Sequence, residues 1–240
     1  NAPAWALLNG ERQYGISWHV ISSGVDTGEL LEQDFFDIAE NETSLSINTK
    51  CFAAAIDSFP KLLGKLLSGQ VHGMQQDLSK RSYFGKYQRP ETLGIIDWTS
   101  RAKDIEALVR AMDFGDYPNP LTTAKLVIGS DILIATSALA VEEATSAAPG
   151  TIVDVEEGEV RVACGEGCVA LTVFKDLSGR ALTPGEAAGQ FSLQRDRQLP
   201  LLDEADRSQI VELSKTLVRG ETDWIETLQY LDPVEVPFAG

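Results

Sequence analysis

Asp26 is the first candidate for chemistry, because it lies in a turn of small residues between two apolar, strand-like runs. The runs are GISWHVI and LLEQDFFDI, and the turn between them reads SSGVDTGE. Catalytic side chains often lie on such loops, where a rigid scaffold holds them. Asp followed two residues later by Gly is also ordinary turn chemistry. The pattern by itself therefore leaves two interpretations open, a catalytic carboxylate and a turn cap.

The cysteines offer a second candidate, a metal site. Cys51, Cys164 and Cys168 are too few and too scattered for a disulfide framework, which favours a reducing, cytoplasmic location. CGEGC places two thiols with three residues between them, but His19 and His72 have no finger-like spacing to complete a zinc set. We expect no metal site. The two thiols are expected in a strand and its turn, and His72 in a solvated linker.

Composition limits the partners of the chain. Its 240 residues suffice for one large domain or two small ones. A net charge of −16 argues against nucleic acid, whose phosphates require a basic surface. No apolar run is long enough to cross a bilayer and no signal-peptide pattern is present, so we expect no membrane partner. The sequence begins without a strand before its first helical pattern, and we expect a piece of a longer polypeptide.

The first elements that would position Asp26 are two strands and a long helix. Residues 3–9 read as the end of a helix that stops near Gly10, and the strand-like runs follow. Residues 41–69 read as a helix with Thr43 or Ser44 as N-cap, a kink or break at Pro60 and a stop at Gly69. Such a helix needs a sheet to pack against, and this chain supplies little of one. Its apolar stripe is Leu45, Phe52, Ile56, Phe59, Leu63 and Leu66.

A second unit follows a polar linker over residues 70–92. We expect a short helix within 96–114, capped by Thr99 or Ser100, and then at least three β runs with turns at 156–158 and 178–180. Strands with Gly-rich turns behind one helix suggest a small β-barrel. Residues 194–209 read as a charged linker, 210–231 as a helix whose Trp and Leu stripe packs, and 232–240 as a segment broken by prolines.

The order of these elements resembles the 10-formyltetrahydrofolate-dependent formyltransferase family over about residues 1–190. GIIDW at 94–98 resembles the start of the family's C-terminal domain, and PGTIVDV and LTVFKDLSGRALTPGEAAG resemble its later barrel strands. The resemblance implies an α/β fold: the C-terminal part of a Rossmann-like catalytic domain at 1–70, a linker at 71–92, an OB-like β-barrel at 93–190 and a helical linker at 191–240. The catalytic-domain pattern is carried by Asn9, Gly10, Glu11, Gly15, His19, Asp26, Thr27 and Gly28.

The resemblance also implies a site. In the family an Asn and a His of an N-x-H motif stabilise an oxyanion, while an Asp orients the His and helps to relay a proton. Asp26 matches that Asp, and His19 matches a His that either assists or packs on its strand. No N-x-H occurs in this chain, so we expect it upstream and expect the isolated chain to be inactive. The loop beside the folate co-substrate, 10-formyltetrahydrofolate, would comprise Ile21, Ser22, Ser23, Gly24, Val25, Thr27 and Gly28.

The family resemblance implies an amine as the acceptor of the formyl group but does not identify which amine. Residues 91–190 hold 16 Asp and Glu against 7 Lys and Arg, a poor balance for binding tRNA. The segment DWIETLQYLDPVEVPFA resembles the entry segment of nonribosomal peptide synthetase modules. We therefore expect a formylation domain that acts on an aminoacyl group of a carrier protein. The alternatives are a methionyl-tRNA or sugar-amine formyltransferase and a non-catalytic scaffold module.

Overall fold

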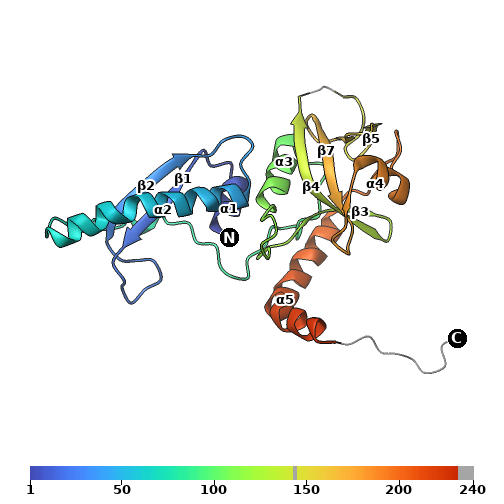
Figure 1. Cartoon of the computed structure of the whole chain (residues 1–240). Coiled ribbons are helices and arrows are strands. Elements are labelled where there is room, and N and C mark those ends of the chain that lie inside the picture. The colour runs from blue at the N-terminus through green and yellow to red at the C-terminus, as the bar shows by residue number, and fades with distance from the viewer. Residues whose placement is uncertain (143–144, 232–240) are drawn as a thin grey trace.

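The chain forms two units connected by a long coil (Figure 1). A computed structural model describes residues 1–142 and 145–231. Within those residues, no helix combines the length and apolarity needed to span a membrane. The first unit consists of α1 (Ala2–Leu8), β1 (Gln13–His19), β2 (Leu30–Asp37) and α2 (Ser44–Leu67), and the coil contains the short 3-10 helix η1 (Leu78–Lys80). The second consists of α3 (Ala102–Ala111), β3 (Ala124–Ile128), β4 (Asp131–Val141), β5 (Ile152–Val155), β6 (Val160–Ala163), β7 (Cys168–Lys175), β8 (Ala181–Leu182), α4 (Pro184–Phe191) and α5 (Glu204–Gln229).

In the first unit, β1 and β2 form an antiparallel ribbon covered by α2. The register runs from Gln13 opposite Asp37 to His19 opposite Leu30, with an irregularity at the end nearest the Asp26 loop. The indole nitrogen of Trp18 donates to the hydroxyl of the buried Ser58 on α2, at 2.9 Å. This bond ties the strand that ends at His19 to the helix, so the Asp26 loop starts from a fixed position.

The predicted ends of α2 are confirmed, and of the two outcomes expected at Pro60, a kink or a break, the break does not occur. Thr43 is the N-cap and forms a reciprocal capping box with Ser46. The helix ends at a left-handed Gly69 with φ +69°. Between them the helix continues through Pro60. Pro60 removes the donor for the carbonyl of Ile56, and because both residues are exposed, water can satisfy that carbonyl instead.

The apolar stripe of α2 faces outward rather than into a core. The residues that α2 buries are Ser44, Ile47, Ser58 and Leu62. The sequence stripe lies on another face because β1 and β2 cover only one side of the helix, and the described residues place no second sheet against it. Its exposed members, together with the neighbouring Leu67, are Phe52, Ile56, Phe59, Leu63, Leu66 and Leu67.

The second unit is a curled antiparallel sheet with helices against it (Figure 1). The strand order is β3-β4-β7-β6-β5, with β8 paired to β7. The predicted turns at 156–158 and 178–180 do connect β5 to β6 and β7 to β8. The mixed α/β class is confirmed. Its core contains the fully or almost fully buried Trp98, Ile105, Leu133, Leu171 and Phe174.

Three local predictions for this unit are wrong. Arg101, not Thr99 or Ser100, is the N-cap of α3, because both hydroxyls donate to the Asp97 carboxylate instead. The segment 171–189 was expected to form barrel strands, but α4 begins within it, after a capping box at Thr183. The expected linker at 194–209 already contains the first turns of α5, because Asp203 caps that helix.

α5 is held at its start and exposed along much of its length. Arg207 forms an ion pair with Asp97 at 2.6 Å, and both side chains are largely buried. Further along, the Trp and Leu stripe does not pack as predicted. Trp224 is 64% exposed, and about half or more of Leu213, Leu217 and Leu228 is exposed as well. The expected proline-broken segment at 232–240 lies outside the described residues.

Replacing Asp97 by Asn is expected to lower the free energy of local unfolding at the start of α5 by about 1–2 kcal/mol. The substitution removes a partly buried ion pair and weakens a hydrogen bond to a charged group. Burial raises the pKa of Asp97, but hydrogen bonds from Arg207 and Thr99 outweigh it and hold that pKa below the usual 3.8. The stabilisation is therefore present above about pH 4 and lost as the pH falls through the lower, folded-state pKa. Hydrogen exchange of the α5 amides measures it.

The control for this prediction is Glu212→Gln on the same helix, whose ion pair with Lys215 is exposed and contributes little. Equal exchange rates in the Asp97 variant and this control at pH 7 would show that the Arg207 ion pair does not anchor α5.

Candidate active site

The loop over residues 20–29 is closed at its neck by its own backbone. The amide of Val20 donates to the carbonyl of Glu29 at 2.9 Å. Gly28 crosses so near that a Cβ on it would lie 1.7 Å from the carbonyl oxygen of Val20. The requirement for glycine at 28 therefore has a cause inside the chain, the crossing of two backbone segments.

His19 and Asp26 meet at this neck. Nε2 of His19 lies 3.5 Å from Oδ1 of Asp26, and the exposed fractions of the two side chains are 28% and 76%. Nδ1 of His19 lies 2.9 Å from the carbonyl oxygen of Val20, which can only accept, so the tautomer with its proton on Nδ1 would donate there. Nε2 then donates to Asp26 only in the doubly protonated ring. The geometry suits an acid–base pair open to water.

The backbone of Asp26 lies in the left-handed region, with φ +52°. Asp tolerates this conformation better than most residues, at a cost below that of a bulky side chain. The conformation places the carboxylate against His19, seven residues earlier in the chain. The sequence paired these two residues only through the family resemblance, whereas the structure brings their side chains together.

The remaining residues predicted beside the folate form the rim of the loop. Ile21 is 92% exposed, and Val25 is also largely exposed. The hydroxyls of Ser22 and Thr27 bond one another at 2.8 Å across the loop. The rim thus presents apolar and backbone surface to solvent. Ser23 and Gly24 are exposed at its tip.

Residues of the expected linker contact this loop, and the sequence did not predict these contacts. Met74 and Leu30 exchange two backbone hydrogen bonds of 2.8 Å. Gln76 and Arg81 donate to carbonyls of the loop. Nothing in the polar composition of residues 70–92 signals these contacts, because the partners lie about fifty residues away in the sequence.

The cysteines do not join the site. Burial, followed by the neighbouring Cys168, raises the pKa of the Cys164 thiol to about 12, so that thiol is not a ready nucleophile or ligand. Cys168 opens β7, and Cys164 lies in the preceding turn, as predicted. His72 is exposed in the coil, also as predicted. Among residues 1–142 and 145–231 no three metal-ligating side chains gather in one place.

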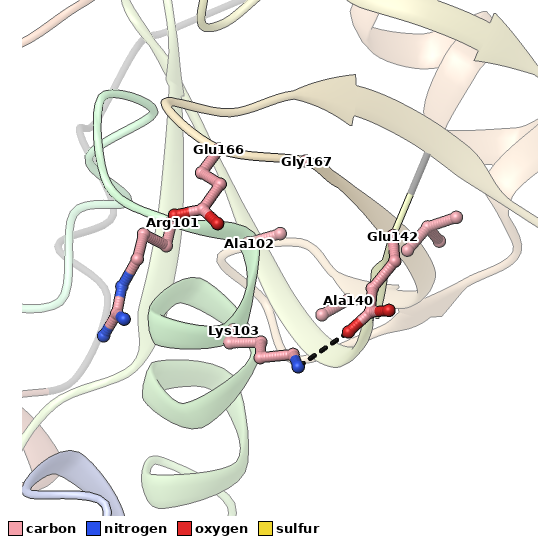
Figure 2. A pocket seen from close by; sticks show the side chains of 8 residues that line it. Arg101, Ala102, Lys103, Ala140, Glu142, Glu166 and Gly167 are labelled. Carbon is pink, nitrogen blue, oxygen red and sulfur yellow. Dashed lines mark hydrogen bonds and ion pairs between the residues drawn. The ribbon is translucent and has the colours of Figure 1, made fainter. Parts of the chain in front are cut away.

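A hollow of about 600 Å³ lies elsewhere, where α3 begins against the ends of β4 and the β6–β7 turn. Figure 2 shows Lys103 pointing toward Glu142 there, at 2.8 Å, while the guanidinium of Arg101 points away from Glu142. Arg101 is itself bound to Asp104 by two bonds of 2.8 Å. Because its cations are already paired and exposed, this hollow offers less for catalysis than the His19–Asp26 pair.

Residues 90–191 match the family model of the formyl transferase C-terminal domain. The chain is also 26% identical over 167 residues to the methionyl-tRNA formyltransferase of Clostridium novyi (strain NT), an alignment that covers 70% of this chain and 52% of that protein. The chain thus spans about half the length of this curated relative. Together the two matches support the formyltransferase family.

Solved structures with the same fold extend the likeness to the first unit. HypX from Aquifex aeolicus, in complex with tetrahydrofolic acid, has a TM-score of 0.59 at 21% identity and covers 80% of this chain and 32% of its own. The N-formyltransferase from Helicobacter canadensis, in complex with folinic acid and dTDP-3-aminofucose, has a TM-score of 0.57 at 17% identity, with 71% and 59% covered. At these identities the likeness shows the fold.

Proposed function

We propose that the protein carrying this chain transfers a formyl group from 10-formyltetrahydrofolate to a primary amine. The observation that carries the proposal is the His19–Asp26 pair, at 3.5 Å, on a loop whose sequence resembles the Asp-bearing loop of formyltransferases. The C-terminal domain match over residues 90–191 supports it independently.

In the proposed reaction, the amine nitrogen attacks the formyl carbon and a tetrahedral oxyanion forms. The new carbon–nitrogen bond is kept, the bond to N10 of the folate breaks, and a proton moves from the amine to N10. Asp26 and His19 would hold and pass that proton, through water, next to the reacting nitrogen. The oxyanion would be stabilised by an Asn and a His of an N-x-H motif in the longer polypeptide.

The exposed apolar face of α2 supports the proposal that residues 1–70 are one part of a larger catalytic domain. Phe52, Ile56 and Phe59 are exposed on it, and a buried side chain of this size contributes about 1.5–3 kcal/mol. We propose that the remaining sheet of a Rossmann-like domain covers this face, with residues 1–70 as the domain's C-terminal part. Residues 93–190 would form an OB-like barrel, 71–92 the linker, and 191–240 a helical connection.

For the acceptor, we propose an aminoacyl group on a carrier protein of a nonribosomal peptide synthetase. Five of the seven Lys and Arg in residues 91–190 already pair with carboxylates, which leaves little positive charge for tRNA phosphates. Methionyl-tRNA is the second candidate acceptor, because the Clostridium novyi relative is a methionyl-tRNA formyltransferase.

The test begins with the coding sequence on both sides of residues 1–240. The resulting polypeptide is then assayed with 10-formyltetrahydrofolate and three amines: aminoacyl carrier protein, methionyl-tRNA and an amino sugar nucleotide. Formylated carrier protein in the mass spectrum supports the proposal. Formylated tRNA, with binding that weakens steeply as salt rises, would move the function to the second candidate. No reduced-folate binding would indicate a scaffold.

A further inference from the structure

We propose that residues 74–81 act as a clasp that positions Asp26 for catalysis. The clasp is the part of the coil between the two units that contains Met74, Gln76 and Arg81. This inference deepens the proposed function and rests on it. It assigns the coil a task beyond connecting the units, because its side chains hold the loop that carries the candidate carboxylate.

The clasp begins where backbone hydrogen bonds join the coil to the β1–β2 ribbon. Leu30 and Met74 each donate to the other's carbonyl at 2.8 Å, as a short antiparallel bridge at the neck of the loop. Gly73 lies against the Glu29 side chain so closely that a Cβ would overlap it at 2.2 Å. These contacts fix the direction in which the coil leaves the ribbon, along the loop.

Gln76 then binds the segment around Asp26 directly. Its Nε2 donates to the carbonyl of Asp26 at 3.0 Å and to the carbonyl of Gly28 at 2.5 Å. One amide group thus bridges two peptide units on either side of Thr27. Because Gln76 is half-buried, water competes less well for these carbonyls than at the loop tip.

Arg81 binds the preceding peptide unit. Its guanidinium donates to the carbonyl of Val25 at 3.1 Å and lies 5.2 Å from the centre of the Tyr83 ring. A hydrogen bond from a charged donor is stronger than a neutral one. Val25, Asp26 and Gly28 are therefore all tied to the clasp by side chains that donate to their backbone carbonyls.

The restraint matters because Asp26 is otherwise poorly held. Its backbone has the left-handed φ of +52°, and its side chain is mostly in solvent. A loop free to relax would leave that conformation and move the carboxylate from His19, since proton transfer requires groups within hydrogen-bond reach. Gln76 and Arg81 are thus positioning residues, and they act on catalysis through the geometry of Asp26.

The experiment uses the full polypeptide with Gln76→Glu, Gln76→Leu and Arg81→Met. Gln76→Leu removes the donor without adding charge. Gln70→Glu is the matched control, since Gln70 is exposed in the same coil and none of the side-chain hydrogen bonds among the described residues involves its amide. Arg81→Lys, which keeps a charged donor, should restore most of what Arg81→Met loses.

Two readouts are needed. Amides of residues 20–29 should exchange about tenfold faster in both Gln76 variants and in Arg81→Met, since each loses one or two hydrogen bonds to the loop. kcat for formyl transfer should fall by about tenfold, with little change in KM for the folate, because near-attack geometry is lost rather than binding surface. The Gln70 control should match the wild type in both.

The outcomes separate the two proposals. A wild-type polypeptide without formyl transfer would reject the proposed function, while faster exchange confined to the clasp variants would still support the contact between clasp and loop. An active wild type whose kcat is unchanged by Gln76→Leu and Arg81→Met would overturn the positioning role, whatever the exchange rates show.

Discussion

Asp26→Asn in the full polypeptide is expected to lower kcat for formyl transfer by about two to four orders of magnitude, the usual contribution of a positioned acid–base group. Asn has the same shape and tolerates a φ of +52°, so the loop should keep its conformation. The carbonyl that accepts from Gln76 is also retained. What disappears is the negative charge facing Nε2 of His19.

Steady-state kinetics checks this prediction, with hydrogen exchange of residues 20–29 to show that the loop is intact. Asp37→Asn is the control, because Asp37 is exposed at the far end of β2 and pairs with Gln13 through the backbone alone. A kcat within about twofold of the wild type in Asp26→Asn would remove this carboxylate from the chemistry, since a catalytic acid–base group is expected to contribute far more.

The second large effect is expected from Gly28→Ala, which should open the neck of the loop. The added methyl carbon would overlap the Val20 carbonyl at 1.7 Å, and that atom belongs to the backbone, so it cannot rotate away. Overpacking of this kind costs about 1–3 kcal/mol or more. The hydrogen bond between Val20 and Glu29 should break, and the Kd for reduced folate should rise at least about tenfold.

Folate binding and urea unfolding measure this effect. Gly64→Ala is a matched control: Gly64 lies inside α2, and beyond the adjoining backbone of the helix no atom lies within 4 Å of the added carbon, so the same substitution should stabilise that helix by up to about 1 kcal/mol. If both variants bind folate as the wild type does, the neck crossing does not support the binding loop.

Much of the local structure follows from neighbouring residues in the sequence. The capping pattern at Thr43 and the glycine at 69 set the ends of α2, because caps satisfy backbone groups within one turn. The turns at 156–158 and 178–180 were also predictable from the turn preference of Gly158 and Gly179. α2 does not break at Pro60, an exposed site, and α3 is not capped by Thr99 or Ser100 because their hydroxyls bond Asp97. The early start of α5 follows from a local cap at Asp203 that the charged composition of the segment hid.

The sequence by itself determined most of the helical and extended segments and their order, since these depend on short-range patterns. Its resemblance to the formyltransferase family singled out Asp26 as the candidate acid. The tertiary structure alone decided which face of α2 is buried, that His19 and Asp26 meet at 3.5 Å, and that Gln76 and Arg81 reach the loop. Periodicity marks a face as apolar but does not say which surface covers it. Hydrogen bonds between residues about fifty positions apart depend on the path of the folded backbone, which no local pattern encodes.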